Sequence, residues 1–153
     1  MFERFTESAR RTIVLSQGEA EALMHDHVGP SHLLLGVLTA EGATAGTLLA
    51  PLGVDADAVR RQVVARYGTG ENKPPGQIPF SDDSKKVLQG SLRESLALDH
   101  TYIGTEHVLL GLVSGSAPDA GEILEALGVR RDTVREAVMT RLGSAAGAEP
   151  AEP

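Results

Sequence analysis

Apolar residues recur at helical spacing along most of the chain, with no sustained alternation of the kind typical of a β-strand. The first such stretch follows Thr6, a predicted N-cap. Its small and apolar residues are spaced by four, three, four and three positions: Ala9, Ile13, Ser16, Ala20 and Leu23. This spacing places them on one face of an α-helix. The pattern therefore predicts an all-α fold.

Turn residues divide the rest of the first half into further helices. Gly29 and Pro30 interrupt the pattern, and Ser31 is predicted to cap the apolar helix that follows. A short helix then covers roughly residues 44–52 and stops at Gly53.

A fourth helix is predicted to begin at Asp55, where Val54 and Val59 have the spacing of a hydrophobic staple. The second half repeats this plan. Its predicted helices cover residues 82–99, 105–113, 119–127 and 131–142.

The chain is an internal duplication. A shift of 75 residues aligns residues 5–63 with residues 80–138 without a gap, and 21 of the 59 pairs are identical. One well-kept stretch is GPSHLLLG at 29–36, which aligns with GTEHVLLG at 104–111. Residues aligned by this shift are called mates below. An ungapped match of this length indicates two copies of one unit. We therefore predict two pseudo-symmetric four-helix repeats packed as one globular domain.

The segments outside the two units differ in composition. Glycine and proline dominate GTGENKPPGQIP, so residues 68–79 are predicted to be a linker or an extended surface crossing. It separates repeat 1 (residues 1–67) from repeat 2 (residues 80–142). Residues 143–153 lack apolar periodicity and are predicted to be a disordered tail.

Composition narrows the classes of function. The absence of Cys removes disulfides and thiolate chemistry, and a net charge of −7 disfavours nucleic-acid binding. Aromatic residues make up only 3%, so the core is expected to be aliphatic. No window is apolar enough to cross a membrane, and the charged N-terminus is unlike a signal peptide. We therefore expect a cytoplasmic protein without nucleic-acid or membrane partners.

The sequence gives little support for metal binding or nucleotide hydrolysis. The sequence contains no P-loop, no G-x-S-x-G and no H-E-x-x-H motif. His25 and His27 could approach a metal, but their mates are His100 and Tyr102, so repeat 2 would lack the matching ligand. We therefore expect no metal and no cofactor.

The other histidines favour structural roles. His32 and His107 follow a tight turn at the start of a helix, where a hydrogen bond that locks the turn is the favoured interpretation. His25 and His100 lie near helix C-termini, where imidazole can meet free carbonyls. A small hydrolase using His32 or His107 is the enzymatic alternative, but no nucleophile with an orienting partner stands at a recognisable spacing.

Two further features are a pair of helix glycines present in both repeats and a carboxylate present only in the second. Gly36 and Gly111 lie inside predicted helices, which favours close helix approach as their role. Glu106 lies in the first turn of a helix, where the helix dipole stabilises a carboxylate. The functional alternative is a carboxylate held ready for a cation.

A resemblance to a known family rests on four segments: MFERFTESARRTIVLSQ, GPSHLLLGVL, PFSDDSKKVL and YIGTEHVLLGLV. They resemble the double-repeat N-terminal domain of Clp-type AAA+ unfoldases of the ClpC kind, and the resemblance covers residues 1–142. It implies an all-α docking module, not an enzyme. Such a module receives protein clients and adaptor proteins before an ATPase ring unfolds them for a protease.

The resemblance also implies phosphoarginine sites, one in each repeat. Carried over by repeat, the first would use Thr6 and Ser31, and the second Ser81 and Glu106. Ser31 stands where the family has a carboxylate, and two aspartates follow Ser81. We therefore expect weak or no phosphoarginine binding at the first site and at best residual binding at the second.

Relatives also bind cyclic peptide antibiotics on an apolar surface near the two-fold axis. The matching positions form a predicted apolar peptide surface here: Phe2, Ile13, Phe80, Lys85, Leu88 and Gln89. An alternative is that the apolar members seal the junction between the repeats.

The resemblance therefore predicts a non-enzymatic module that binds proteins or peptides. The sequence contains no AAA+ module, which leaves an excised domain and a free-standing protein as alternatives; the acidic Pro–Ala tail favours a natural end. As a free-standing protein it would be an adaptor or a decoy that sequesters cyclic peptides. A structural partner that docks on a Clp unfoldase ring is the remaining alternative.

Overall fold

The computed structural model describes residues 3–115 and 117–144. Over these residues the chain forms eight α-helices: α1 (Glu7–Ala22), α2 (Pro30–Thr39), α3 (Thr44–Leu49), α4 (Ala56–Tyr67), α5 (Asp82–Ala97), α6 (Thr105–Val113), α7 (Pro118–Ala126) and α8 (Arg131–Ser144). A 3₁₀ turn, Ala50–Leu52, extends α3. The described residues contain two isolated β-bridges and no strand. The all-α prediction is confirmed.

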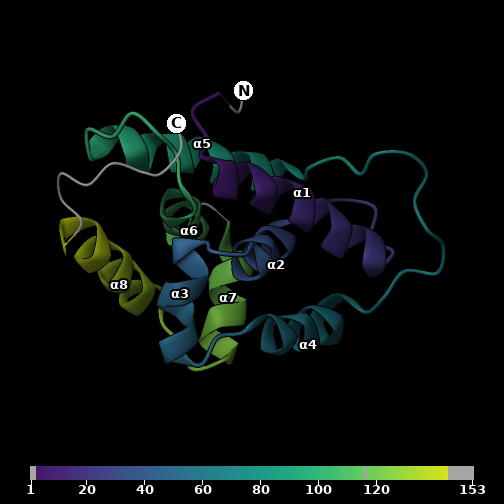
Figure 1. The fold of residues 1–153 in the computed structure, drawn as a ribbon. Helices are drawn as coiled ribbons and strands as arrows, with labels where there is room; N and C mark the ends of the chain where they lie inside the picture. Colours follow the sequence, from purple (N-terminus) through teal and green to yellow (C-terminus); the bar gives the residue numbers. More distant parts are fainter. Residues whose placement is uncertain (1–2, 116, 145–153) are drawn as a thin grey trace.

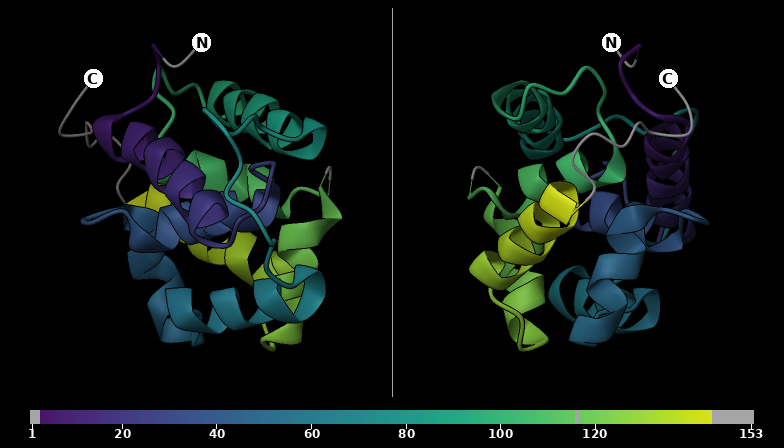
Figure 2. Two further views of the ribbon diagram at one scale, coloured as in Figure 1. Left: turned by 90° about the vertical axis from the view of Figure 1, so that its right-hand side faces the viewer. Right: turned by 60° about the vertical axis from the view of Figure 1, so that its left-hand side comes forward.

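Helices α2 and α6 lie in contact at the centre of the molecule (Figure 1). Each is covered by the first helix of its own repeat, α1 on α2 and α5 on α6. The remaining helices contact the other repeat as well, α3 against α6 and α8, and α7 against α2 and α4. The two views in Figure 2 show this exchange, which makes one body out of two similar halves.

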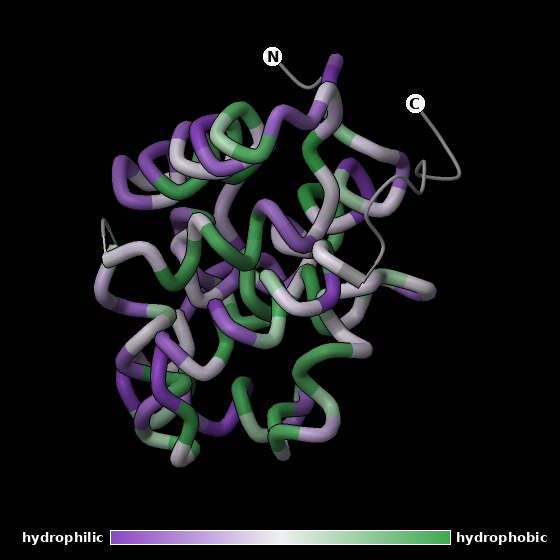
Figure 3. Tube along the Cα trace, turned by 90° about the vertical axis from the view of Figure 1, so that its left-hand side faces the viewer, coloured by the Kyte–Doolittle hydropathy of each residue, from purple (hydrophilic) through white to green (hydrophobic). Residues whose placement is uncertain are grey.

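Aliphatic side chains fill the centre, as the low aromatic content predicts. Leu33, Leu34 and Leu35 of α2 are fully buried, and so are Leu109 and Leu110 of α6. Apolar, green stretches run through the middle of the trace in Figure 3. Among the described residues no single helix is long and apolar enough to cross a membrane; residues 30–39 and 44–52 pass that test only as a pair bent by 93°.

The helix starts test the predicted caps. Thr6 and Asp55 are N-caps as predicted, and Ser81, the mate of Thr6, caps α5 in the same way. All three side chains accept backbone N–H groups three residues ahead. The Ser31 cap is wrong, because α2 begins two residues earlier than predicted, with Gly29 as its N-cap. Pro30 occupies the first helical position, where its missing N–H costs nothing.

The two helix glycines allow close packing, as predicted. A Cβ on Gly36 would lie 2.5 Å from the Thr12 carbonyl oxygen, and one on Gly111 would lie 2.6 Å from the Val87 carbonyl oxygen. Thr12 and Val87 are mates, so the same close approach joins α1 to α2 and α5 to α6.

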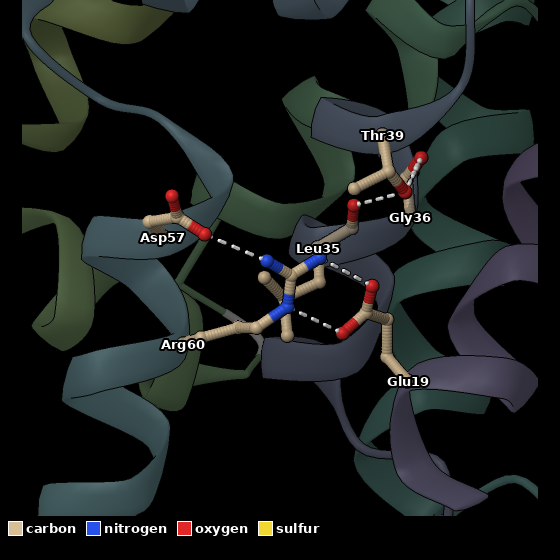
Figure 4. Close-up of polar contacts among 6 residues, drawn as sticks. All are labelled: Glu19, Leu35, Gly36, Thr39, Asp57 and Arg60. Atoms are coloured by element: carbon tan, nitrogen blue, oxygen red, sulfur yellow. Dashed lines mark hydrogen bonds and ion pairs between the residues drawn. The ribbon is translucent and has the colours of Figure 1, made fainter. Parts of the chain in front are cut away.

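An ion pair ties the first helix of each repeat to the last. Arg60 of α4 donates two hydrogen bonds, of 2.9 and 2.8 Å, to Glu19 of α1 and a third to Asp57 (Figure 4). In repeat 2, Arg135 of α8 makes two bonds of 3.2 Å to Glu94 of α5. This pairing raises the pKa of Arg60, chiefly through the hydrogen bonds to Glu19.

The segment between the repeats crosses the surface from α4 to α5 (Figure 1). Its start is fixed by Gly70, whose N–H donates to the Leu23 carbonyl at 2.9 Å. Near its end Ile78 is 4% exposed and packs with Ala20 and Val28. The linker is therefore held at both ends against repeat 1. Of the predicted tail, Gly143 and Ser144 belong to α8, and residues 145–153 lie outside the described residues.

Candidate docking site

The first helix of each repeat begins beside the central helix of the other repeat. Ile103, just before α6, donates its N–H to Arg4 at 2.8 Å and accepts from Thr6 at 3.0 Å. Its mate Val28, just before α2, does the same with Pro79 and Ser81 at 2.8 and 3.0 Å. Short backbone pairings thus cross the repeats in both directions.

This crossing changes how the four residues of the predicted phosphoarginine sites are grouped. Ser81 lies with Ser31 in the lining of one cavity, and Thr6 is bonded to Ile103 next to the helix that carries Glu106. The sites expected from the resemblance paired residues within one repeat, Thr6 with Ser31 and Ser81 with Glu106. That grouping is wrong, because sequence alignment shows which residues are mates and not which repeat each faces.

The two helix starts also differ in charge. At α2, the Ser31 N–H donates to Asp119 Oδ2 at 3.2 Å, and the Tyr67 hydroxyl donates to Asp119 Oδ1. A carboxylate of the protein therefore occupies the place where an anionic ligand would meet this amide. Burial, and then the bond to Asp119, raise the pKa of Tyr67 to about 12.

At α6 a half-buried carboxylate lies close to the helix start. Glu106 Oε1 is 2.6 Å from the position that a Cβ on Gly104 would take, so the carboxylate lies against the backbone at the helix start. The neighbouring Thr105 is engaged elsewhere, because its hydroxyl oxygen accepts the Ala45 N–H of α3 at 3.2 Å.

The histidines lock turns, as predicted. The Gly29 N–H donates to His32 Nδ1 at 2.9 Å, so the proton of neutral His32 is on Nε2, which lies 2.9 Å from His25 Nδ1. His25 Nε2 then donates to the Gly68 carbonyl at 2.8 Å, at the end of α4. One ordered chain of hydrogen bonds joins α2, α1 and α4.

Repeat 2 contains the same arrangement. Gly104 N–H donates to His107 Nδ1 at 2.9 Å, and His107 Nε2 lies 2.8 Å from His100 Nδ1. Burial lowers the pKa of His107 to about 4, and that of His32 also to about 4; the paired histidine adds to each shift. Within the described residues no three His, Asp or Glu side chains are placed to hold a metal ion.

A second cavity opens beside α5. It has a volume of about 280 Å³ and is lined by Glu3, Arg4, Phe5, Leu88, Gln89, Leu92 and Ile103. We call it the α5 groove. Its centre is apolar, with Phe5 and Ile103 buried and Leu92 37% exposed, and the charged groups of residues 3 and 4 stand among its lining.

The predicted apolar peptide surface is divided by the structure. Leu88 and Gln89 line the α5 groove, whereas Ile13 and Leu88 are only 9% and 6% exposed and belong to one core cluster. Phe80 is half-buried and packs against that cluster, and Lys85 is exposed. Phe2 lies outside the described residues.

Sequence reasoning missed the residues that complete both cavities. Leu92, Ile103, Tyr67 and Asp119 received no role, although Leu92 follows Leu88 by one helical turn and that spacing was a usable signal. No local signal could place Asp119 beside Ser31, because 88 residues separate them.

The duplication, the crossed pairings and the central pair of helices define a double-repeat helical domain. Its sequence matches the family described as "Clp repeat (R) N-terminal domain" over residues 4–127 and 94–152. The chain belongs to this family, which confirms the resemblance.

Two of the matching relatives are much longer than this chain. The chain is 38% identical over 144 residues to the chaperone protein ClpB of Oceanobacillus iheyensis and 36% identical over 144 residues to the negative regulator of genetic competence ClpC/MecB of Bacillus subtilis. Each match covers 94% of the chain but 18% of the relative. The chain thus spans less than a fifth of the length of these relatives.

Solved structures share the fold. The N-terminal domain of the chaperone ClpD from Arabidopsis thaliana superposes with a TM-score of 0.79 at 32% identity, covering 94% of this chain and 97% of that one. A complex of the ClpV N-domain with VipB peptide shares the fold with a TM-score of 0.68 at 16% identity, covering 95% of this chain and 91% of that one.

Proposed function

We propose that this domain is a non-enzymatic docking module that holds an apolar segment of a client or adaptor protein in the α5 groove. The observation that carries the proposal is the groove itself, a cavity of about 280 Å³ whose apolar centre is open at Leu92. Concave apolar sites with a few polar groups at the rim are the usual form of ligand pockets.

Pseudo-symmetry supports a peptide as the occupant. In repeat 1 the segment that pairs with Val28 buries an apolar side chain, Ile78, against that repeat. The mate of Ile78 is Glu3, which is exposed, and the space beside it in repeat 2 is the α5 groove. An apolar side chain supplied by another protein would give repeat 2 a contact similar to the one that Ile78 gives repeat 1.

The family supports the same class of function. The ClpV N-domain, in a complex with VipB peptide, shares this fold, so a domain of this shape does hold a peptide. The chain covers only 18% of its ClpB and ClpC relatives, and the remainder of those proteins is outside the chain. Docking of the domain on a Clp unfoldase and a cytoplasmic location both stay predictions.

A pair of leucines on α5 provides the test. Leu92→Ser removes an apolar side chain from the groove, and Leu96→Ser, one turn later and 51% exposed, removes the same side chain outside it. Fluorescence anisotropy with labelled β-casein, an unstructured apolar protein, should show binding weakened about tenfold or more by Leu92→Ser only. Equal effects of both substitutions, or none, would contradict the proposal. Circular dichroism should be unchanged in both variants, since neither residue is buried.

The second candidate is the decoy that sequesters apolar cyclic peptides. It is favoured by Leu88 and Gln89, two positions of the predicted apolar peptide surface that line the groove. Titration with an apolar N-methylated cyclic peptide against linear β-casein separates the two functions. Tight binding of the cyclic peptide with no binding of casein would favour the decoy.

A further inference from the structure

A chain of hydrogen bonds through two histidine rings links the start of α2 to the linker. The Gly29 N–H donates to His32 Nδ1 at 2.9 Å, and His32 Nε2 lies 2.9 Å from His25 Nδ1. His25 Nε2 in turn lies 2.8 Å from the Gly68 carbonyl oxygen. The first bond fixes the direction of the other two, because a backbone amide can only donate. Both rings are therefore neutral with the proton on Nε2, and all four ring nitrogens are engaged.

This chain ends where the linker begins. Gly68 is the C-cap of α4, with a left-handed φ of 65°. Two residues later the Gly70 N–H donates to the Leu23 carbonyl oxygen at 2.9 Å, and a Cβ on Gly70 would collide with the Met24 carbonyl oxygen. The start of the linker is thus held on the turn between α1 and α2 at two adjacent points, and one of them is a histidine ring.

Repeat 2 has the same pair of rings without this last connection. His107 Nε2 lies 2.8 Å from His100 Nδ1, but His100 Nε2 has no hydrogen-bond partner among the residues that the structure describes. The mate of Gly68 is Gly143, which lies within α8. The His100 ring instead stacks on Tyr102, with ring centroids 5.1 Å apart. The bond from a histidine to the end of the last helix is therefore specific to repeat 1.

A further proton cannot enter the pair in repeat 1 without breaking it. The unprotonated nitrogen of each ring, Nδ1, already accepts an N–H, on His32 from Gly29 and on His25 from His32. An imidazolium has two donors and no acceptor, so protonation of either ring turns one of these bonds into two opposed N–H groups. Burial of the ring, and then the charge of His25, lower the pKa of His32 to about 4, while Glu19 opposes the shift.

The other ionisable groups around the pair, which come from every neighbouring element, are bound to one another. Glu19 of α1 pairs with Arg60 of α4, Asp26 of the turn with His27, Lys73 of the linker with Glu21, Asp83 of α5 with Lys86, and Tyr67 of α4 with Asp119 of α7 and with Arg66. Histidine is the side chain that ordinarily changes charge between about pH 5 and 8. The charge that changes beside the linker in this range is therefore that of histidine, and His27 is exposed and outside the chain of bonds.

We propose that the bond from the histidine pair to Gly68 is an acid-sensitive latch, which fixes the linker on repeat 1 at neutral pH and releases it when the pair takes up a proton. The half-buried His25 ring, once protonated, turns away from His32 toward solvent and leaves the Gly68 carbonyl. The linker from Thr69 to Pro75, which forms one wall of a cavity of about 710 Å³, then opens while α2 and α6 stay packed. This device is independent of the α5 groove.

Amide hydrogen exchange, followed by NMR on the whole domain, tests the latch with the Gly70 N–H as the reporter. Between pH 7.5 and 5.5 the ratio of open to closed linker should rise about tenfold for one proton taken up, after correction for intrinsic exchange rates. Gly70 should also exchange faster than the buried amides of α6 at both pH values, because local opening costs less than unfolding. Equal exchange of Gly70 and α6 would mean that only global unfolding exposes the linker, and would overturn the proposal.

His25 and its mate His100 form a matched pair of variants. His25→Gln keeps an acceptor for His32 but loses the bond to Gly68, so exchange of Gly70 should rise about tenfold at pH 7.5 and lose its dependence on pH. His100→Gln makes the same change in repeat 2, and His27→Gln removes an exposed titrating group; both should leave the exchange of Gly70 unchanged. Equal effects of His25→Gln and His100→Gln, or a full pH dependence retained in His25→Gln, would contradict the latch.

A measurement on the natural sequence keeps the test informative if His25→Gln loses its helical circular dichroism. Long-range ¹H–¹⁵N correlation spectra at pH 7.5 should show His25 and His32 protonated on Nε2 and unprotonated on Nδ1. A proton on Nδ1 of either ring would overturn the order of donors on which the latch depends. Leu92→Ser should leave the exchange of Gly70 unchanged, so that a failure of the α5 groove and a failure of the latch give different results.

Discussion

In repeat 1 the linker packs Ile78 against Ala20 and Val28, whereas in repeat 2 the mate of Ile78 is the exposed Glu3. The cavity beside Glu3 is the α5 groove. The central helices differ in the same way, because Asp119 bonds to the start of α2 while its mate is the uncharged Thr44. A duplication has thus produced two similar frameworks with different surfaces, and each surface has its own cavity.

The frameworks themselves agree closely. Gly36 and Gly111 allow the same close approach, and His32 and His107 lock the same turn. Each of these groups is buried, where a change in one residue forces its neighbours to move. Exposed mates carry no such constraint, so they are free to differ, and the comparison predicts equal responses inside and unequal responses outside.

The largest effect is expected from a methyl group on the central helices. Gly36→Ala and Gly111→Ala each place a Cβ about 2.5 Å from a carbonyl oxygen of the covering helix, so α1 or α5 must move. We expect each to lower the free energy of unfolding by about 3 kcal/mol. Urea denaturation measures this, with Gly18→Ala as the control.

Gly18 lies inside α1 with no atom near its added Cβ, so Gly18→Ala should stabilise by about 0.5–1 kcal/mol through helix propensity. A loss below about 1 kcal/mol for either Gly36→Ala or Gly111→Ala would show that the two frameworks are not equally tight.

The second test lowers the pH. His32 and His107 have pKa values of about 4 in the folded domain, whereas the pKa of a histidine in the unfolded chain is about 6.5. As the pH falls below about 6.5 the unfolded chain takes up protons first, so stability is present at neutral pH and is lost down to about pH 4. Between pH 7.5 and 5.5 each histidine should account for a loss of about 1.5 kcal/mol.

Asparagine substitutions isolate this contribution. His32→Asn and His107→Asn keep a side-chain acceptor for the turn and remove the titrating group. Each should reduce the pH dependence of the free energy of unfolding by a similar amount, because the two turns have the same hydrogen bonds. If one variant retains the full pH dependence of the natural sequence, that histidine does not remain neutral in the folded state.

The features that were predicted correctly from the sequence are the internal repeat and those that depend on neighbouring residues. Helical spacing, the caps Thr6 and Asp55, the helix glycines and the turn histidines all depend on residues within a few positions of one another. The Ser31 cap failed because Gly29 and Pro30 together start α2 two residues earlier. Competing local signals of this kind determine the first residue of a helix only to within one or two positions.

The candidate sites depended on contacts that no local pattern contains. Ser81 meets Ser31 and Thr6 meets Ile103 because the repeats exchange their first segments, and both arrangements fit the same internal alignment. Asp119 reaches Ser31 from repeat 2 in the same way. Predicting such pairs requires the packing of one repeat on the other, which the mates alone do not specify.

The smallest expected difference lies in the ion pairs that join the first and last helices. Arg60 and Glu19 make bonds of 2.9 and 2.8 Å, and Arg135 and Glu94 make bonds of 3.2 Å. The Glu19 side chain is also less exposed than that of Glu94. Double-mutant cycles with Arg→Met and Glu→Gln should give coupling energies of about 1 kcal/mol for repeat 1 and about 0.5 kcal/mol for repeat 2.

Measuring the coupling energies at high salt tests whether the difference between the two ion pairs is electrostatic. Because both pairs are partly exposed, each coupling energy should fall when the cycles are repeated in 1 M NaCl. The exposed pair of Arg60 with Asp57 is the internal reference and should couple by only about 0.3 kcal/mol. A stronger coupling in repeat 2 than in repeat 1 would mean that packing of the arginine stems, and not the charge contact, sets the difference between the repeats.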